Sequence, residues 1–87
     1  PTIVVTHHAP SAQGLIARQA GSGVEGAYAS PMDDFVALSG ATAWIHGHTH
    51  ASHTYFCDTV PVITNCRGYP GERLPTFDPG KILTVTW

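Results

Sequence analysis

The sequence is poor in charged residues, and this limits the partners that it can have. Lys and Arg number four in 87 residues and the charged fraction is 11%, well below the roughly one quarter usual for a soluble domain. A nucleic-acid groove needs clustered basic residues, so the composition argues against one. A small domain with so little charge has difficulty covering its apolar faces. We therefore expect a neighbour, either a missing amino-terminal half or a second copy in a homodimer.

Long apolar runs are absent and cysteine is scarce. No stretch approaches the ~20 apolar residues of a membrane-spanning helix, and the chain opens directly on a predicted strand, so we expect neither a membrane anchor nor a signal peptide. The two cysteines, Cys57 and Cys66, flank a predicted turn near Asp58 and lie at unequal distances from it. Because a disulfide needs Cα atoms within about 7 Å, we expect free thiols and a reducing, cytoplasmic compartment.

The chain is predicted to begin with a strand, which an irregular segment follows. Residues 2–6 (TIVVT) form a β-branched run that predicts a strand buried on both faces. A turn of helix is predicted over residues 11–19, with Ser11 as its cap, although Gly14 weakens it. Glycines at positions 21, 23 and 26 then mark a loop.

The clearest predicted helix lies between Ser30 and Gly40. Ser30 is a good N-cap and Pro31 suits the first helical position, while Gly40 supplies the left-handed terminator. Phe35 and Leu38 lie three residues apart, so they share one face, and we expect that face to be buried in the core.

The second half of the chain is predicted to be mostly strand. Residues 41–45 form a second apolar strand, with Trp44 in the core. A hairpin, a Gly- and Pro-rich loop and a final alternating strand follow, over residues 53–57 and 60–65, 65–73, and 81–87. Strand, helix, strand and then antiparallel strands indicate one α/β domain over residues 1–87, with a mixed sheet and one main helix.

Histidine is present in excess, and five of the six fall into two clusters. The first cluster follows the first strand and the second follows the strand at residues 41–45; the members are His7 and His8, and His46, His48 and His50. If a helix connects two parallel strands, their carboxyl ends share one edge of the sheet, where ligand sites lie. We therefore expect the two clusters to meet there.

Imidazole binds Zn, Fe, Mn and Ni, which makes a metal site the leading interpretation of the clusters. In an extended segment His48 and His50 would point the same way, whereas in a tight loop after Gly47 they would diverge onto two neighbouring metals. The alternative is that a buried histidine is simply hydrogen-bonded in the core. That alternative suits His46, and His53 is expected at the surface.

Three short segments of the sequence resemble motifs of one enzyme superfamily. Residues 4–10 (VVTHHAP) resemble the fourth motif of calcineurin-like metallophosphoesterases, a hydrophobic strand that ends in a metal-binding histidine. Residues 44–50 (WIHGHTH) resemble the fifth motif, Gly-His-x-His. Residues 65–72 (NCRGYPGE) resemble a loop found after the hairpin in one bacterial branch, where Pro is more usual than Cys66. The three segments occur in the same order as in the superfamily, and the resemblance extends over essentially the whole chain.

The resemblance implies a fold, a cofactor and a reaction. The fold would be part of a four-layer αββα sandwich around two divalent transition metals (Mn, Fe, Zn or Ni), with His7 and His48 on one ion and His50 on the other. Members of the superfamily hydrolyse phosphomonoesters or phosphodiesters with two cations about 4 Å apart. His8 and Arg67 are candidate substrate-binding residues, since a guanidinium matches phosphate oxygens. Arg67 has the alternative of pairing with Glu72.

The chain also departs from the superfamily. Its Asp-x-His, Gly-Asp and Gly-Asn-His motifs are missing, and no Asp or Glu precedes Glu25. Without the bridging carboxylate the second metal has no anchor, so we expect this polypeptide to be inactive alone, and no catalytic residue is assigned.

Three interpretations follow. The chain is the carboxyl-terminal fragment of a metal-dependent phosphoester hydrolase, or a stand-alone metal-binding or homodimeric assembly module. In that second case His7, His48 and His50 would converge on one ion. The third interpretation is a folded remnant with no metal function.

Overall fold

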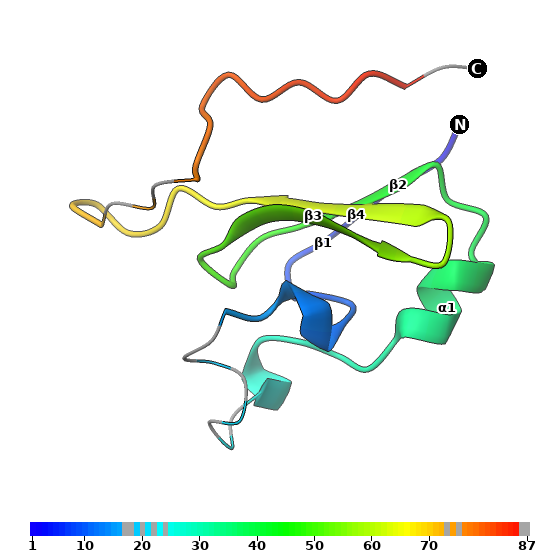
Figure 1. The fold of residues 1–87 in the computed structure, drawn as a ribbon, viewed down its shortest axis with the longest axis horizontal. Coiled ribbons are helices and arrows are strands. Elements are labelled where there is room, and N and C mark those ends of the chain that lie inside the picture. Colours follow the sequence, from blue (N-terminus) through cyan, green and yellow to red (C-terminus); the bar gives the residue numbers. More distant parts are fainter. Residues whose placement is uncertain are drawn as a thin grey trace.

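The computed structural model describes residues 1–16, 19, 21, 23, 25–72, 74 and 76–85. Four strands form one sheet in the order β1-β2-β4-β3, with α1 and two short 3₁₀ turns, η1 and η2, on one side of it (Figure 1). The elements are β1 (Ile3–Thr6), η1 (Ala12–Gly14), η2 (Glu25–Ala27), α1 (Asp33–Leu38), β2 (Ala43–His46), β3 (Ser52–Cys57) and β4 (Val60–Asn65).

The sheet is mixed, as the sequence predicted. Strand β2 pairs in parallel with β1 on one side and with β4 on the other, and β3 pairs antiparallel to β4. In the β1–β2 register Thr6 lies opposite His46, so the two strands end at the same level. The segments that follow them therefore start from the same edge of the sheet, which confirms the predicted arrangement.

The hairpin also forms where the turn signal placed it. Cys57 pairs with Val60 across the two-residue turn, in which Asp58 adopts a left-handed φ of 55°. Asx side chains tolerate this conformation better than most. Cys57 and Cys66 are both free thiols, which confirms that prediction.

Helix α1 begins later than predicted. It starts at Asp33, and Met32 at the N-cap position makes no side-chain cap. The predicted cap, Ser30, is held outside the helix because its N–H donates to the Ala9 carbonyl (2.9 Å) next to the bridge between Ala9 and Ala29. The helix ends at Leu38, and Gly40 follows with a φ of 70°, so the predicted terminator is confirmed.

The core lies between α1 and one face of the sheet, and the prediction for the helix face was wrong. Val36 is fully buried and Trp44 is buried as predicted, but Phe35 is 62% exposed and Leu38 is 87% exposed. A helix of six residues meets the sheet along a narrow stripe, and Val36 occupies it. Phe35 touches the core at the rim, edge-on to the Trp44 ring at a centroid distance of 6.3 Å.

Strand β1 is not buried on both faces as predicted. It is an edge strand, and Val5 on the face opposite α1 is 71% exposed. An apolar β-branched run has the same pattern at an edge as at the centre of a sheet, so the sequence did not separate the two.

The predicted final strand does not form within the described residues, since 81–85 contain no strand and positions 86 and 87 lie outside the described part. The carboxyl-terminal segment instead passes over the face opposite α1, where Leu83 lines a pocket with Ile45 and Ile63 (Figure 1). Over a face, its backbone cannot reach the hydrogen-bonding edge of a strand.

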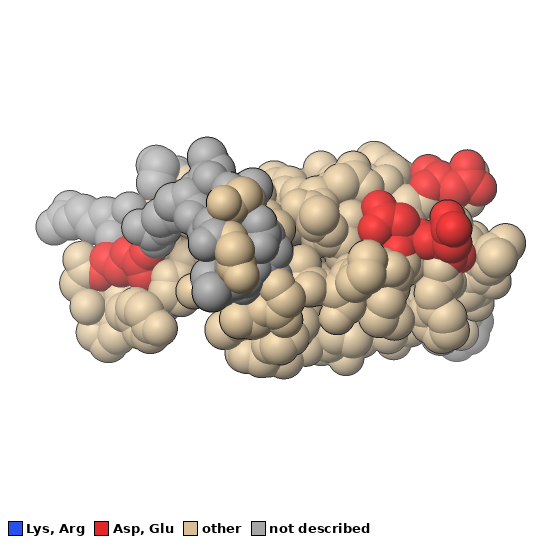
Figure 2. Space-filling model, turned by 90° about the horizontal axis from the view of Figure 1, so that it is seen from below, with Lys and Arg blue, Asp and Glu red and all other residues tan. Residues whose placement is uncertain are grey.

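The described residues of the stretch 11–19 include the 3₁₀ turn η1, in which the Ser11 hydroxyl accepts from the Gln13 N–H as a cap. Positions 17 and 18 of the predicted helix lie outside the described residues. No helix in the described part of the chain is long and apolar enough to cross a membrane. On the face that carries the helices, the acidic side chains of the described residues lie toward the two ends (Figure 2).

The two thiols are expected to differ in reactivity. Cys57 is 4% exposed, and burial, followed by the nearby charge of Asp33, raises the pKa of its thiol. Cys66 is partly exposed, and alkylation requires an accessible thiolate. Iodoacetamide should therefore label Cys66 well before Cys57 in the native protein, as read by peptide mass spectrometry. Cys66→Ser should remove the fast phase, and equal rates at both positions would contradict this packing.

Candidate metal centre

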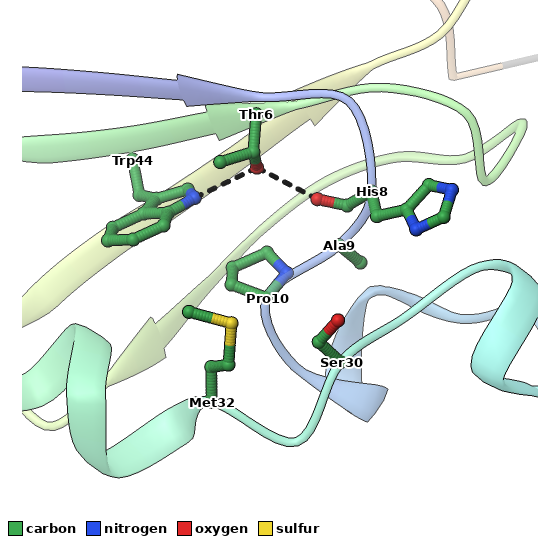
Figure 3. A pocket seen from close by; sticks show the side chains of 7 residues that line it. All are labelled: Thr6, His8, Ala9, Pro10, Ser30, Met32 and Trp44. Carbon is green, nitrogen blue, oxygen red and sulfur yellow. Dashed lines mark hydrogen bonds between the residues drawn. The ribbon is translucent and has the colours of Figure 1, made fainter.

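A hydrogen-bonded clamp fixes the turn that carries the first histidine pair. The Thr6 hydroxyl donates to the His8 carbonyl (2.8 Å) and accepts from the Trp44 indole N–H (3.1 Å). These groups border an open pocket of about 180 Å³, and the His8 ring points away from it (Figure 3). The core residue Trp44 thus helps to set the direction in which the turn after β1 leaves the sheet.

The turns after β1 and β2 are joined directly. The Gly47 N–H donates to the His7 carbonyl (3.2 Å), and the rings that follow come together. The His7 and His48 ring centroids are 4.4 Å apart, those of His8 and His48 4.9 Å, and those of His7 and His8 5.2 Å. His48 of the second cluster therefore meets both histidines of the first at the sheet edge, as the sequence predicted, whereas His46 and His50 contact other groups.

Three histidines lie close enough to hold one metal ion. One ring nitrogen from each of His7, His8 and His48 lies within 4.8 Å of the others. Ligand nitrogens around a tetrahedral zinc ion, each 2.0–2.1 Å from it, are about 3.4 Å apart. Shifts of about an ångström and a half in exposed or half-buried side chains would bring the nitrogens to that spacing.

His48 is oriented by contacts that the sequence did not indicate. Its Nε2 lies 2.9 Å from the Ala27 carbonyl, and because a carbonyl only accepts, Nε2 must carry the proton. Its Nδ1 then offers the lone pair. The Tyr28 ring stacks on the imidazole at 5.0 Å. A hydrogen bond of this kind on the second ring nitrogen is the usual way that proteins fix a metal-binding imidazole.

The loop between the histidines carries backbone strain. His48 and His50 have φ values of 68° and 54°, a left-handed conformation that residues with side chains adopt rarely. Between them Thr49 is fully buried, and its hydroxyl has no hydrogen-bond partner among the described residues. Such strain and unsatisfied groups concentrate at functional sites, which supports a role for this loop beyond packing.

His50 does not join the cluster of His7, His8 and His48. Its Nδ1 lies 3.0 Å from one carboxylate oxygen of Glu72 and 3.2 Å from the other. The loop has a left-handed conformation at both residues, and their rings have separate partners, the Ala27 carbonyl for His48 and Glu72 for His50. The convergence expected of His7, His48 and His50 in a one-metal site is found instead with His8 in the third place.

His46 takes the core role expected of it. It is buried, and its Nδ1 lies 3.1 Å from the Gly47 carbonyl, so Nδ1 carries the proton. Nε2 therefore accepts from the Tyr55 hydroxyl at 2.9 Å. Burial lowers the pKa of His46, partly offset by the Gly47 hydrogen bond, and raises the pKa of Tyr55. His53 is exposed, as expected, with its Nε2 3.0 Å from the Gln13 carbonyl.

The predicted phosphate ligand Arg67 borders the same opening as the histidines. It is exposed and lines a pocket of about 400 Å³. The other lining residues are His7, Gly47, His48, His50, Cys66, Gly68 and Tyr69. The Glu72 carboxylate, the sequence-based alternative partner for Arg67, contacts His50.

No protein-family model, curated protein or solved structure matches this chain. The description of the site therefore rests on its residues and their geometry, and the resemblance to the superfamily rests on the three sequence segments alone.

Proposed function

We propose that the chain is the carboxyl-terminal part of a metal-dependent phosphoester hydrolase and contributes imidazole ligands to its metal centre. The observation that carries the proposal is the meeting of His7, His8 and His48, whose ring nitrogens lie within 4.8 Å of one another. These residues come from the two segments, 4–10 and 44–50, that resemble the superfamily's fourth and fifth motifs. The four-layer sandwich belongs to the same proposal, and the exposed apolar side of β1 leaves room for a further layer.

The residues have separate parts in the proposed reaction. His7 and His48 would hold one divalent cation, and His50, which contacts Glu72 instead of joining them, would bind a second. The cations would neutralise charge on the phosphoryl group and supply the nucleophile. Arg67, at the rim of the pocket shared with the histidines, binds phosphate oxygens and so orients the ester. His8 lies beside His48 and serves as a phosphate contact or as a third ligand.

A second function is favoured by the way in which His8 completes the cluster. Three imidazoles around one ion, with a fourth position open to water, form a complete mononuclear zinc site. On this reading the chain is a stand-alone metal-binding module that needs no carboxylate from another segment.

The test combines metal content with turnover. We expect elemental mass spectrometry to find bound transition metal, with no hydrolysis of p-nitrophenyl phosphate or bis-p-nitrophenyl phosphate by the chain alone in Mn²⁺. Adding an amino-terminal half that carries Asp-x-His, Gly-Asp and Gly-Asn-His should then give turnover. One metal per chain with no turnover in the presence of a bound amino-terminal half would favour the stand-alone module. A chain without metal would overturn both.

A further inference from the structure

His50 lies in a cradle that the loop after β4 builds around it. Glu72 places its carboxylate against Nδ1, and the two side chains are 21% and 20% exposed respectively. The Tyr69 ring meets the imidazole edge-on, at a centroid distance of 4.6 Å and an interplanar angle of 77°. One side chain thus holds the ring by a hydrogen bond and the other restrains its rotation.

The cradle is itself fixed by the backbone. The Tyr69 N–H donates to a carboxylate oxygen of Glu72 (2.9 Å), and the Glu72 N–H donates to the Tyr69 carbonyl (2.9 Å). Gly68 has a φ of 83°, and a Cβ there would lie 2.8 Å from the Glu72 carboxyl carbon. The loop therefore needs glycine at this position both for its conformation and for the approach of the carboxylate.

The chemistry of the pair determines which nitrogen of His50 is available. An ionised carboxylate only accepts hydrogen bonds, so Nδ1 of His50 must carry the proton. The lone pair of the neutral ring is then on Nε2. A carboxylate on one nitrogen of a metal-binding histidine fixes the tautomer and makes the other nitrogen a better ligand.

We propose that Glu72 is a positioning residue that holds His50 in the Nδ1-protonated tautomer and presents Nε2 to a divalent cation in the opening that His50 shares with His7, His48 and Arg67. The inference rests on the proposed function, since it assigns His50 to a metal. The two histidines of the Gly-His-x-His motif would then have opposite tautomers. His48 donates a hydrogen bond from Nε2 and offers Nδ1 to a metal, whereas His50 donates from Nδ1 and offers Nε2.

The tautomer is measured without metal or activity. Long-range ¹H–¹⁵N correlation spectra of the ¹⁵N-labelled chain, at a pH where His50 is neutral, should show a proton on Nδ1 and none on Nε2. In Glu72→Ala the ring should shift toward the Nε2-protonated form usual in water, and Glu72→Gln, whose amide oxygen can accept, should restore part of the signal. Asp34→Asn, an exposed acid on α1, is the matched control and should leave His50 unchanged. An Nε2-protonated His50 in the unaltered chain overturns the proposal.

A Zn²⁺ titration separates failure of the positioning from failure of the proposed function. By calorimetry on the chain with the amino-terminal half added, whose carboxylate would anchor the second metal, Glu72→Ala should weaken by about 10- to 100-fold the binding event that needs His50, identified by its loss in His50→Ala. Binding at His7, His8 and His48 should remain within about twofold, because the Glu72 carboxylate is held against His50 and the Tyr69 N–H. If the unaltered chain binds no Zn²⁺ the proposed function fails, and the spectra still decide the tautomer. If His50 has the expected tautomer and Zn²⁺ binding is unchanged in Glu72→Ala, the positioning role is overturned.

Discussion

Replacing His48 by Ala is expected to weaken Zn²⁺ or Mn²⁺ binding at the three-histidine cluster by about 100-fold or more. Loss of an outer contact on a ligand typically costs 10–100-fold in metal affinity, and here a ligand itself is removed. His48 is central to the cluster because its ring lies within 5 Å of both the His7 and His8 rings. The measurement is a competition titration against a chelator of known affinity, since direct calorimetry compresses differences of this size.

The matched control for this experiment is His53→Ala. His53 is an exposed histidine on β3 whose ring contacts Tyr55 and the Gln13 carbonyl instead of the cluster, so the variant removes an imidazole without removing a proposed ligand. Its metal affinity should stay within about twofold of the original. Equal losses in the two variants would mean that metal binds to histidines without regard to position, and the cluster would no longer be a site.

The location of the cluster follows from simple topology. Parallel strands joined through a helix end at one edge, and both sequence clusters stand directly after apolar runs. The meeting of His7 with His48 therefore needed only the correct assignment of β1, α1 and β2. The hairpin was equally accessible, because Asp58 marks a turn between two segments rich in β-branched and aromatic residues.

Which histidines join the three-histidine cluster, and which stay outside it, could not be predicted from the sequence. It depends on the left-handed φ values of His48 and His50, which no pattern of residue types specifies. The contact between His50 and Glu72 was missed for a related reason. The two residues are 22 positions apart in the sequence, and only the fold of the loop around Gly68 brings the carboxylate to His50. The Ala27 carbonyl and the Tyr28 ring gave no signal, since they belong to a loop without periodicity.

Burial was the other quantity that the pattern left undetermined. Phe35 and Leu38 do share a spacing, but a helix of six residues has no long apolar stripe, so its rotation is set by the fit of Val36 against the sheet. The edge position of β1 likewise depends on which other strands are present. Both errors concern the environment of an element and not its existence.

Gly14→Ala is expected to destabilise the fold by about 3 kcal/mol or more. A Cβ at Gly14 would lie 2.7 Å from the Ala9 Cβ, 2.8 Å from the Tyr55 hydroxyl and 3.0 Å from the His46 ring. Overpacking of this kind costs about 1–3 kcal/mol. Separating Tyr55 from His46 would add about 1–3 kcal/mol, because each group is buried and would lose its hydrogen bond.

Gly26→Ala is the matched control for this prediction, because a Cβ there meets no described residue within 4 Å and no left-handed φ is required. Substitution at such a position should leave stability unchanged or raise it by about 0.4–1 kcal/mol through the unfolded chain. Urea unfolding of the metal-free proteins, followed by Trp fluorescence, measures both. Since Ala9 directly follows His8, Gly14→Ala should also weaken metal binding at the three-histidine cluster, which Gly26→Ala should leave intact. A Gly14→Ala protein with the original urea midpoint would mean that η1 does not pack against His46 and Tyr55, and the support beneath the histidine turns would have to come from elsewhere.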